Sequence, residues 1–170
     1  QSIGIKQHIG QNKGSGIYVT NSALTLIDVR LTDNQATDGG GIYSSNADLL
    51  ITGSSISRNL ANSGGGLYVF DGPPPRIDGN DIYNNQATQS GEEIFYDGGQ
   101  LLSAQNNYWG TSDLDYIQSR FSSASKIQLG SISSVALWSD PPRITIDSLS
   151  NGFTSNKRPT FIGKAESNSN

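Results

Sequence analysis

The sequence predicts an all-β fold in which short parallel strands stack coil upon coil. Two phrases predict it, because each returns along the chain at a nearly constant step of 25 to 27 residues. A third observation is that apolar residues within each repeat alternate by two, as Leu49 and Ile51 do, which is the period of a strand and not of a helix. Repeats of roughly 20 to 50 residues are typical of solenoids, whose units bury their apolar faces only against one another.

The first phrase combines glycine with an aliphatic and an aromatic residue. It occurs three times at a step of 25 residues and once more after 27, as Gly16-Ile17-Tyr18, Gly41-Ile42-Tyr43, Gly66-Leu67-Tyr68 and Glu93-Ile94-Phe95. The aliphatic members should point inward as one ladder, and the aromatic members, one residue on, should point outward. Glycine before each strand allows a close corner.

The second phrase ends in asparagine and alanine. Its copies are "LIDVRLTDNQA" from Leu26, "ITGSSISRNLA" from Ile51 and "IDGNDIYNNQA" from Ile77. An aliphatic column and an asparagine column follow from this frame, namely Leu31, Ile56 and Ile82, and Asn34, Asn59 and Asn85. The segment "IKQHIG" fits the same frame, with Ile5 at the aliphatic place and His8, expected to be a polar turn residue, at the asparagine place. The chain therefore holds about four copies.

One copy of the repeat should form one coil of three short strands and three turns. Each strand then pairs with its equivalent in the next coil, about 4.8 Å along the axis. The repeat exists, on this interpretation, because each residue must lie on its equivalent one coil away. The asparagines should occupy tight bends, where their amides can bond to one another along the axis.

The stretch "AQNNYWGTSD", Ala104 to Asp113, should close the core. Trp109 falls at the place of Ile82, and Ala104 falls at the place of Ile77, so a large ring faces a small side chain. The alternative for Trp109 is an exposed ring that stacks on a sugar. After it, "SDLDYIQSRF" predicts a short capping helix with Ser112 as its N-cap and with Ile117 and Phe121 on one face.

The phrases resemble those of right-handed parallel β-helix surface and secreted proteins of bacteria. The likeness is to the repeats of polymorphic outer-membrane proteins and to the pectate-lyase-like superfamily, and it covers residues 1–110. This sequence has Leu or Ile at positions 31, 56 and 82, where those repeats have Phe. "NNYWG" is similar to the signature of the last coil in many secreted β-helices. The resemblance implies a right-handed coil, but not an activity, because the fold carries lyases, hydrolases and adhesins alike.

Three regions follow from these patterns. We expect β-helix coils over 1–110 and a C-terminal cap over 111–140, made of the short helix and one more strand in "GSISSVALW", Gly130 to Trp138. Asp140-Pro141-Pro142 indicates a linker. The phrase "RPTFIGKAE" resembles the opening of a bacterial immunoglobulin-like module, so 141–170 should hold the linker and the first strands of such a module.

Composition limits the classes of partner. The chain of 170 residues carries a formal net charge of -4, which disfavours nucleic acid as a partner. It has no cysteine, so it has no disulfide and no thiolate metal site. No apolar run approaches the roughly 18 residues that span a bilayer. The start at Gln1 lacks a signal peptide and a capping element, so we expect the sequence to be a fragment with further coils upstream and immunoglobulin-like modules downstream.

The outward aromatic column is the first candidate site. It consists of Tyr18, Tyr43, Tyr68 and Phe95. Rings spaced by one coil could bind a glycan or another surface protein. The alternative is that the rings stack on one another and only stiffen their sheet.

Acidic residues form the second candidate site. Asp71 and Asp97 follow two equivalent strands beside glycines and are assigned to one column, so they could bind calcium, the one cofactor considered. The alternative is that both are ordinary turn residues. Glu92-Glu93 replaces two glycines of the repeat, which marks either a site or an altered corner where the cap begins.

Together these features predict a non-enzymatic structural or adhesive segment of a large bacterial cell-surface or secreted protein. A lyase would need a base beside clustered acids, but Arg30, Arg58 and Arg76 occupy three different places in the repeat. The alternative is a fragment of a polysaccharide-active lyase or glycoside hydrolase whose active site lies upstream.

Overall fold

The computed structural model describes residues 3–7, 9 and 12–138. All of them belong to the first of two compact units, Gln1–Ser139. The linker, the immunoglobulin-like module expected at 141–170 and the turn residue His8 lie outside the described residues.

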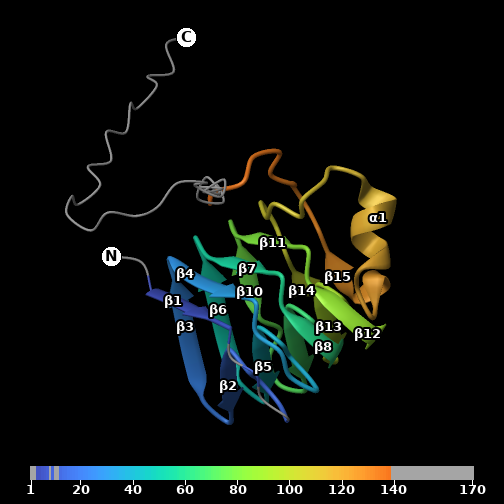
Figure 1. Ribbon diagram of the computed structural model, residues 1–170. Coiled ribbons are helices and arrows are strands. Elements are labelled where there is room, and N and C mark those ends of the chain that lie inside the picture. Colours follow the sequence, from blue (N-terminus) through green and yellow to red (C-terminus); the bar gives the residue numbers. More distant parts are fainter. Residues whose placement is uncertain (1–2, 8, 10–11, 139–170) are drawn as a thin grey trace, which may run out of the picture. The chain divides into compact units, whose positions relative to one another are not determined.

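The described chain coils into stacked parallel strands, as predicted (Figure 1). Four sheets run along the stack. Sheet I holds β1 (Ile3–Lys6), β4 (Val29–Thr32), β7 (Ser55–Ser57) and β11 (Asp81–Tyr83). Sheet II holds β2 (Ile17–Thr20), β5 (Ile42–Ser45), β9 (Leu67–Phe70) and β13 (Ile94–Asp97). Sheet III holds β3 (Ala23–Ile27), β6 (Asp48–Thr52), β10 (Arg76–Asp78), β14 (Leu102–Ser103) and β15 (Ile127–Gln128).

A fourth, short sheet makes the predicted three strands per coil wrong. Sheet IV holds β8 (Leu60–Ser63) and β12 (Gln86–Ser90). Isolated bridges extend it, for example between Gln35 and Leu60. The segment after the asparagine place therefore pairs with its equivalent in the next coil, although it lacks the apolar alternation that marks the other strands.

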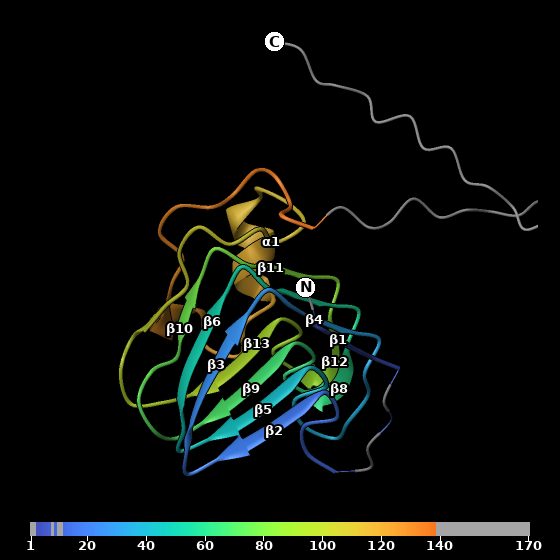
Figure 2. The same ribbon diagram turned by 90° about the vertical axis from the view of Figure 1, so that its left-hand side faces the viewer.

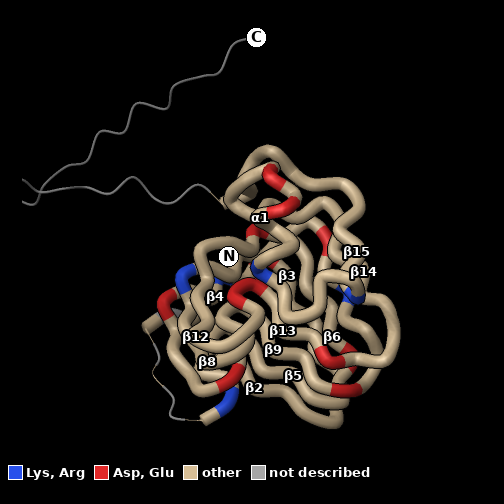
Figure 3. Tube along the Cα trace, turned by 90° about the vertical axis from the view of Figure 1, so that its right-hand side faces the viewer, with Lys and Arg blue, Asp and Glu red and all other residues tan. Residues whose placement is uncertain are grey.

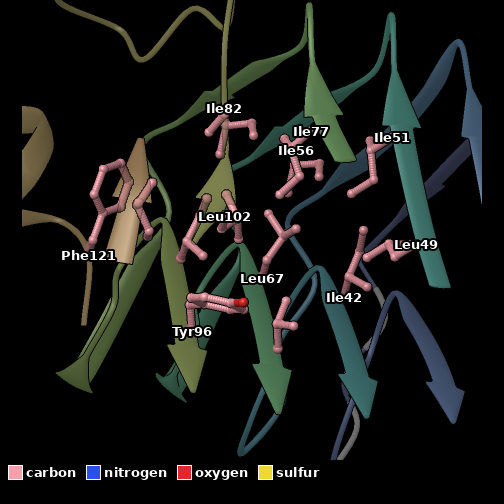
Figure 4. Close-up of a cluster of buried hydrophobic side chains, with 14 of the residues drawn as sticks. Ile42, Leu49, Ile51, Ile56, Leu67, Ile77, Ile82, Tyr96, Leu102 and Phe121 are labelled. Atoms are coloured by element: carbon pink, nitrogen blue, oxygen red, sulfur yellow. The ribbon is translucent and has the colours of Figure 1, made fainter. Parts of the chain in front are cut away.

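The register confirms the predicted step. Ile17 pairs with Ile42, Ile42 with Leu67 and Leu67 with Ile94. Figure 4 shows the side chains of Ile42 and Leu67 inside the stack, together with residues from the facing strands. Like residues thus lie on like residues, and neither Ile42 nor Leu67 retains any exposed surface.

The second aliphatic ladder is also confirmed. Leu31 pairs with Ile56, and Ile56 with Ile82. The bridge between Asp81 and Tyr108 carries this register on to Trp109, whose side chain is 3% exposed and meets the Phe121 ring edge-on at 5.2 Å. Trp109 is therefore a core residue and not an exposed sugar platform.

The repeated glycines are required by the close approach of successive coils. A Cβ atom on Gly16 would lie 2.4 Å from the Gly41 carbonyl oxygen, and one on Gly41 would lie 2.6 Å from that of Gly66. Both distances are too short for any side chain, and the obstructing atoms are backbone. Glycine recurs at this position because the backbone of the next coil occupies the space that a side chain would need.

The C-terminal end of the stack is covered by α1 (Leu114–Ser119), with a short 3₁₀ turn, η1 (Ala124–Lys126), before β15 (Figure 1). Ile117 and Phe121 are buried against the core, as expected. The predicted N-cap was wrong by one residue, because Asp113, not Ser112, accepts the Tyr116 amide N–H.

The predicted strand at Gly130–Trp138 is wrong. The last rung of sheet III is β15, which pairs with β14. Within Gly130–Trp138 only Ile132 pairs, through an isolated bridge to Asn107. Pairing stops because the following residues turn back across the outer face of sheet I, where the Leu137 and Trp138 amides are bound.

Candidate functional site

The aromatic column lies on the outer face of sheet II, whose strands run side by side in Figure 2. Its rings stack nearly parallel: the centroids of Tyr18 and Tyr43 are 5.2 Å apart, those of Tyr43 and Tyr68 5.1 Å, and those of Tyr68 and Phe95 4.4 Å. The interplanar angles are 5°, 13° and 3°. The structure therefore brings all four predicted residues together.

Stacking determines which part of each ring remains available. Tyr18 is 55% exposed, whereas Tyr43, enclosed between two rings, is 4% exposed. Inside the column the ring faces contact one another, so a partner would meet mainly ring edges and hydroxyl groups. Phe70, on the same outer face, adds a ring that is 44% exposed.

A lysine covers part of the column. The Lys13 ammonium donates to the Tyr43 hydroxyl at 2.9 Å and lies 4.7 Å from the ring centroid. This hydrogen bond raises the pKa of Lys13. Burial raises the pKa of the Tyr68 hydroxyl, so both groups keep their protons at neutral pH.

The predicted asparagine column forms a hydrogen-bonded ladder inside the corner between sheets I and IV. Asn34 donates through Nδ2 to the Asn59 Oδ1 at 3.0 Å, and Asn59 donates to the Asn85 Oδ1 at 3.0 Å. The same two oxygens accept the backbone N–H groups of Asn34 and Asn59. All three side chains are buried, so the ladder satisfies polar groups that water does not reach.

Glu93 ends this ladder in the place of a fourth asparagine. Its Oε2 accepts the Asn85 Nδ2 at 2.6 Å and the Asn85 backbone N–H at 3.4 Å. Its Oε1 accepts Arg120, which also donates to the Asn85 carbonyl oxygen. The break at Glu92-Glu93 is thus the altered corner that joins the coils to the cap.

The carboxyl of Glu93 has a perturbed pKa. Burial raises it to about 7, although the hydrogen bonds from Asn85 and the charge of Arg120 lower it. A hollow of about 300 Å³ adjoins it, lined by Asn84, Glu93, Trp109, Gly110, Thr111, Asp113 and Tyr116. Both oxygens of Glu93 are already bound within the protein, so the geometry assigns this carboxyl to holding the cap.

Asp71 and Asp97 do not share a column, which corrects the assignment from sequence. Asp97 pairs with Phe70, so it lies one residue out of register with Asp71. Asp97 lies 4.0 Å from the Lys126 ammonium, and Asp71 accepts the Gly72 amide N–H. Among the described residues, no three His, Cys, Asp or Glu side chains group closely enough to hold a metal ion.

A second buried ladder escaped the sequence analysis. Asn80 donates through Nδ2 to the Asn107 Oδ1 at 3.1 Å, and Asn80 in turn accepts the Ser54 backbone N–H. Asn107 follows Asn80 by 27 residues, and this spacing was the signal that could have revealed the ladder. Its first member is a serine, whose hydroxyl accepts the Val29 amide N–H, so the asparagine pattern is incomplete.

Charged residues are scattered over the described part of the chain, as Figure 3 shows. Asp81 differs from most of these charged residues, because it lies on the outer face of sheet I and is nevertheless fully buried.

No helix among the described residues is long and apolar enough to cross a membrane.

Comparison with known proteins agrees with this architecture. The family model described as "Right handed beta helix region" matches residues 2–129, which include all the stacked coils and the cap helix. No curated protein and no solved structure matches the chain significantly. The coiling, the one-coil register and this match lead to one conclusion: the chain belongs to the right-handed β-helix family.

Proposed function

We propose that this chain is a non-enzymatic, adhesive and load-bearing segment of a larger bacterial cell-surface or secreted protein. The observation that carries the proposal is the continuous aromatic column, which places one ring of each coil on a single outer face. The resemblance of the repeat to bacterial surface proteins supports the location.

The load-bearing part of the proposal rests on how the coils are held together. Backbone hydrogen bonds join every coil to the next, and two buried side-chain ladders run in the same direction. Because these bonds lie between every pair of neighbouring coils, they resist lengthening along the whole stack, which suits a stiff spacer.

The adhesive part rests on the chemistry of the outer face of sheet II. The column of ring edges and tyrosine hydroxyls runs along the axis beside a shorter column of Thr20, Ser45 and Phe70. Hydroxyls that donate and accept beside apolar ring edges suit an elongated glycan lying along the column, and we propose this class of partner.

The test is binding to immobilised glycans of varied backbone. We expect binding by the wild-type chain and a loss of at least tenfold in affinity for the Tyr18→Ala/Phe70→Ala variant, which removes two exposed rings from the outer face of sheet II. The matched control is Leu101→Ala/Leu114→Ala, which removes exposed apolar side chains elsewhere and should bind normally. Equal binding by both variants, or binding only to a protein partner, would contradict the glycan proposal.

The alternative is a fragment of a polysaccharide-active enzyme whose active site lies upstream, because the buried carboxylates of the described residues are already used within the fold. Glu93 holds the cap, and Asp81 holds two backbone amides. We expect no turnover of pectin-like and other acidic glycans. Turnover that vanishes in the Asp71→Asn/Asp97→Asn or Glu93→Gln variant would instead establish the enzyme.

A further inference from the structure

The outer face of sheet I binds a segment of the chain's own backbone. The Asp81 carboxylate accepts the Leu137 N–H through Oδ1 at 2.9 Å and the Trp138 N–H through Oδ2 at 2.7 Å. The two segments are 57 residues apart, so no local turn explains the contact. Consecutive N–H groups of an extended chain point to opposite sides, so a carboxylate that accepts two of them recognises a bent main chain, and the chain does bend at Leu137 and Trp138.

Trp138 supplies the side-chain contacts of this segment. Its indole Nε1 donates to the Gly53 carbonyl oxygen at 3.0 Å, and the Arg30 guanidinium lies 5.2 Å from the ring centroid. Arg30, Ser55 and Asp81 form one outward column on three successive coils, because Arg30 pairs with Ser55 and Ser55 with Asp81. The segment therefore crosses the coils along the stack axis.

We propose that this column is a peptide-binding site that holds Leu137–Trp138, here called the strap, as an exchangeable ligand in cis. The site consists of Arg30, Gly53, Ser55 and Asp81. Its ligand class is a peptide that bends at a tryptophan, so that two consecutive backbone N–H groups point the same way. The inference is independent of the function proposed above, which concerns sheet II.

The contacts show which parts of the peptide the site reads. The Leu137 side chain is 60% exposed, so the site binds the backbone of this residue and tolerates other side chains. The tryptophan side chain makes two specific contacts: a hydrogen bond from its indole N–H to the Gly53 carbonyl oxygen, and a cation–π contact with Arg30. Tryptophan anchors of this kind dominate many peptide interfaces.

Two buried hydroxyls on the outer face of sheet I lack a partner while the strap is bound. Ser55 and Ser57 alternate with the inward Ile56 and so belong to the outer face, yet both are buried and neither hydroxyl has a hydrogen-bond partner. An unpaired buried hydroxyl costs free energy, so this face leaves polar groups unsatisfied while the strap is bound. Val135, two residues before the strap, is 70% exposed, so the chain that leads into the strap makes few contacts there.

The test uses a labelled peptide, Ser-Val-Ala-Leu-Trp, which copies residues 134–138, and full-length variants of the chain. We expect the Trp138→Ala chain, whose own strap is weakened, to bind the peptide at least tenfold more tightly than the wild type in fluorescence anisotropy. Adding Asp81→Asn should weaken this binding at least tenfold, whereas adding Asp48→Asn, an exposed aspartate of sheet III, should not change it.

A second measurement does not depend on the variants' folding. In the wild type, the Leu137 and Trp138 amides should exchange hydrogen slowly, and with the same protection as each other. Rapid exchange at both would overturn the proposal, and so would equal peptide binding by the wild-type and Trp138→Ala chains, binding unaffected by Asp81→Asn, or equal binding of a peptide that ends in Ala.

Discussion

At the residue scale, Glu93 shows how one substitution in a repeat can change its role without breaking the fold. The three coils before it present asparagine to one another, and the amides of Asn59 and Asn85 both donate and accept. A carboxylate only accepts, so it can end the ladder but not continue it. Glu93 accepts from Asn85 on one side and from Arg120 on the other, which joins the ladder to the cap.

The raised pKa of Glu93 predicts a pH-dependent stability. Because the pKa is about 7 in the folded chain and 4.5 as the reference value, the folded state binds the proton more tightly. The stabilisation is complete below pH 4.5 and is lost as the pH rises through about 7, by up to about 3 kcal/mol. Urea unfolding of the wild type and of Glu93→Gln across this range checks it; the variant should lack this loss, and parallel profiles would contradict the prediction.

Trp109 is the largest side chain that closes the C-terminal end of the core. Replacing it by alanine should lower the free energy of unfolding by about 3 to 5 kcal/mol, because the ring is buried and packs against Phe121. Chemical denaturation measures the loss. Tyr116→Ala is the control, since that ring is half exposed, and a Trp109→Ala loss below about 1 kcal/mol would mean that the ring does not fill the core.

At the scale of elements, the asparagine ladder is a structure in its own right. Asn59 accepts two N–H groups from Asn34 and donates to Asn85 and to the Leu31 carbonyl oxygen. Substituting it leaves the buried Asn34 backbone N–H without its partner and removes the hydrogen bonds to the Asn85 amide oxygen and the Leu31 carbonyl oxygen.

Asn59→Ala should therefore destabilise the chain by about 2 to 5 kcal/mol, since each unpaired buried group costs about 1 to 3 kcal/mol. Asn62→Ala is the matched control: Asn62 is exposed and should cost less than about 0.5 kcal/mol. Thermal and urea unfolding of both variants are the measurements. A difference of less than 1 kcal/mol between them would show that the ladder contributes little.

The cap was harder to predict than the coils, for physical reasons. The helix was visible because Ile117 and Phe121 have helical spacing, but its start was misplaced since Ser112 and Asp113 are both good N-caps. The strand predicted over Gly130–Trp138 is absent, although the apolar residues there alternate as in a strand. The path of this segment is determined instead by the strap's contacts with distant coils.

At the scale of the whole molecule, the sequence was informative wherever an interaction repeats. The ladder that contains Ile42 and Leu67 and the ladder that contains Asn59 could be predicted, because the same packing or hydrogen-bonding position recurs in successive coils. Contacts made once, such as those of Asp81 with Trp138 and of Glu93 with Arg120, have no periodic signal. The pair Asp71 and Asp97 was misassigned because the two residues are 26 apart, whereas the step between their coils is 27, so that Asp97 pairs with Phe70.

The central claim is that equivalent residues lie one coil apart along a single axis. The chain has no cysteine, so pairs of introduced cysteines report the register without background. Thr25 pairs with Leu50, and Leu50 with Arg76, on the outer face of sheet III, at a spacing that a disulfide can bridge.

We expect Thr25→Cys/Leu50→Cys and Leu50→Cys/Arg76→Cys to form disulfides under mild oxidation, as seen by mass spectrometry. Thr25→Cys/Arg76→Cys, two coils apart, should remain reduced. Cross-linking of the distant pair together with failure of both adjacent pairs would contradict the stacked register.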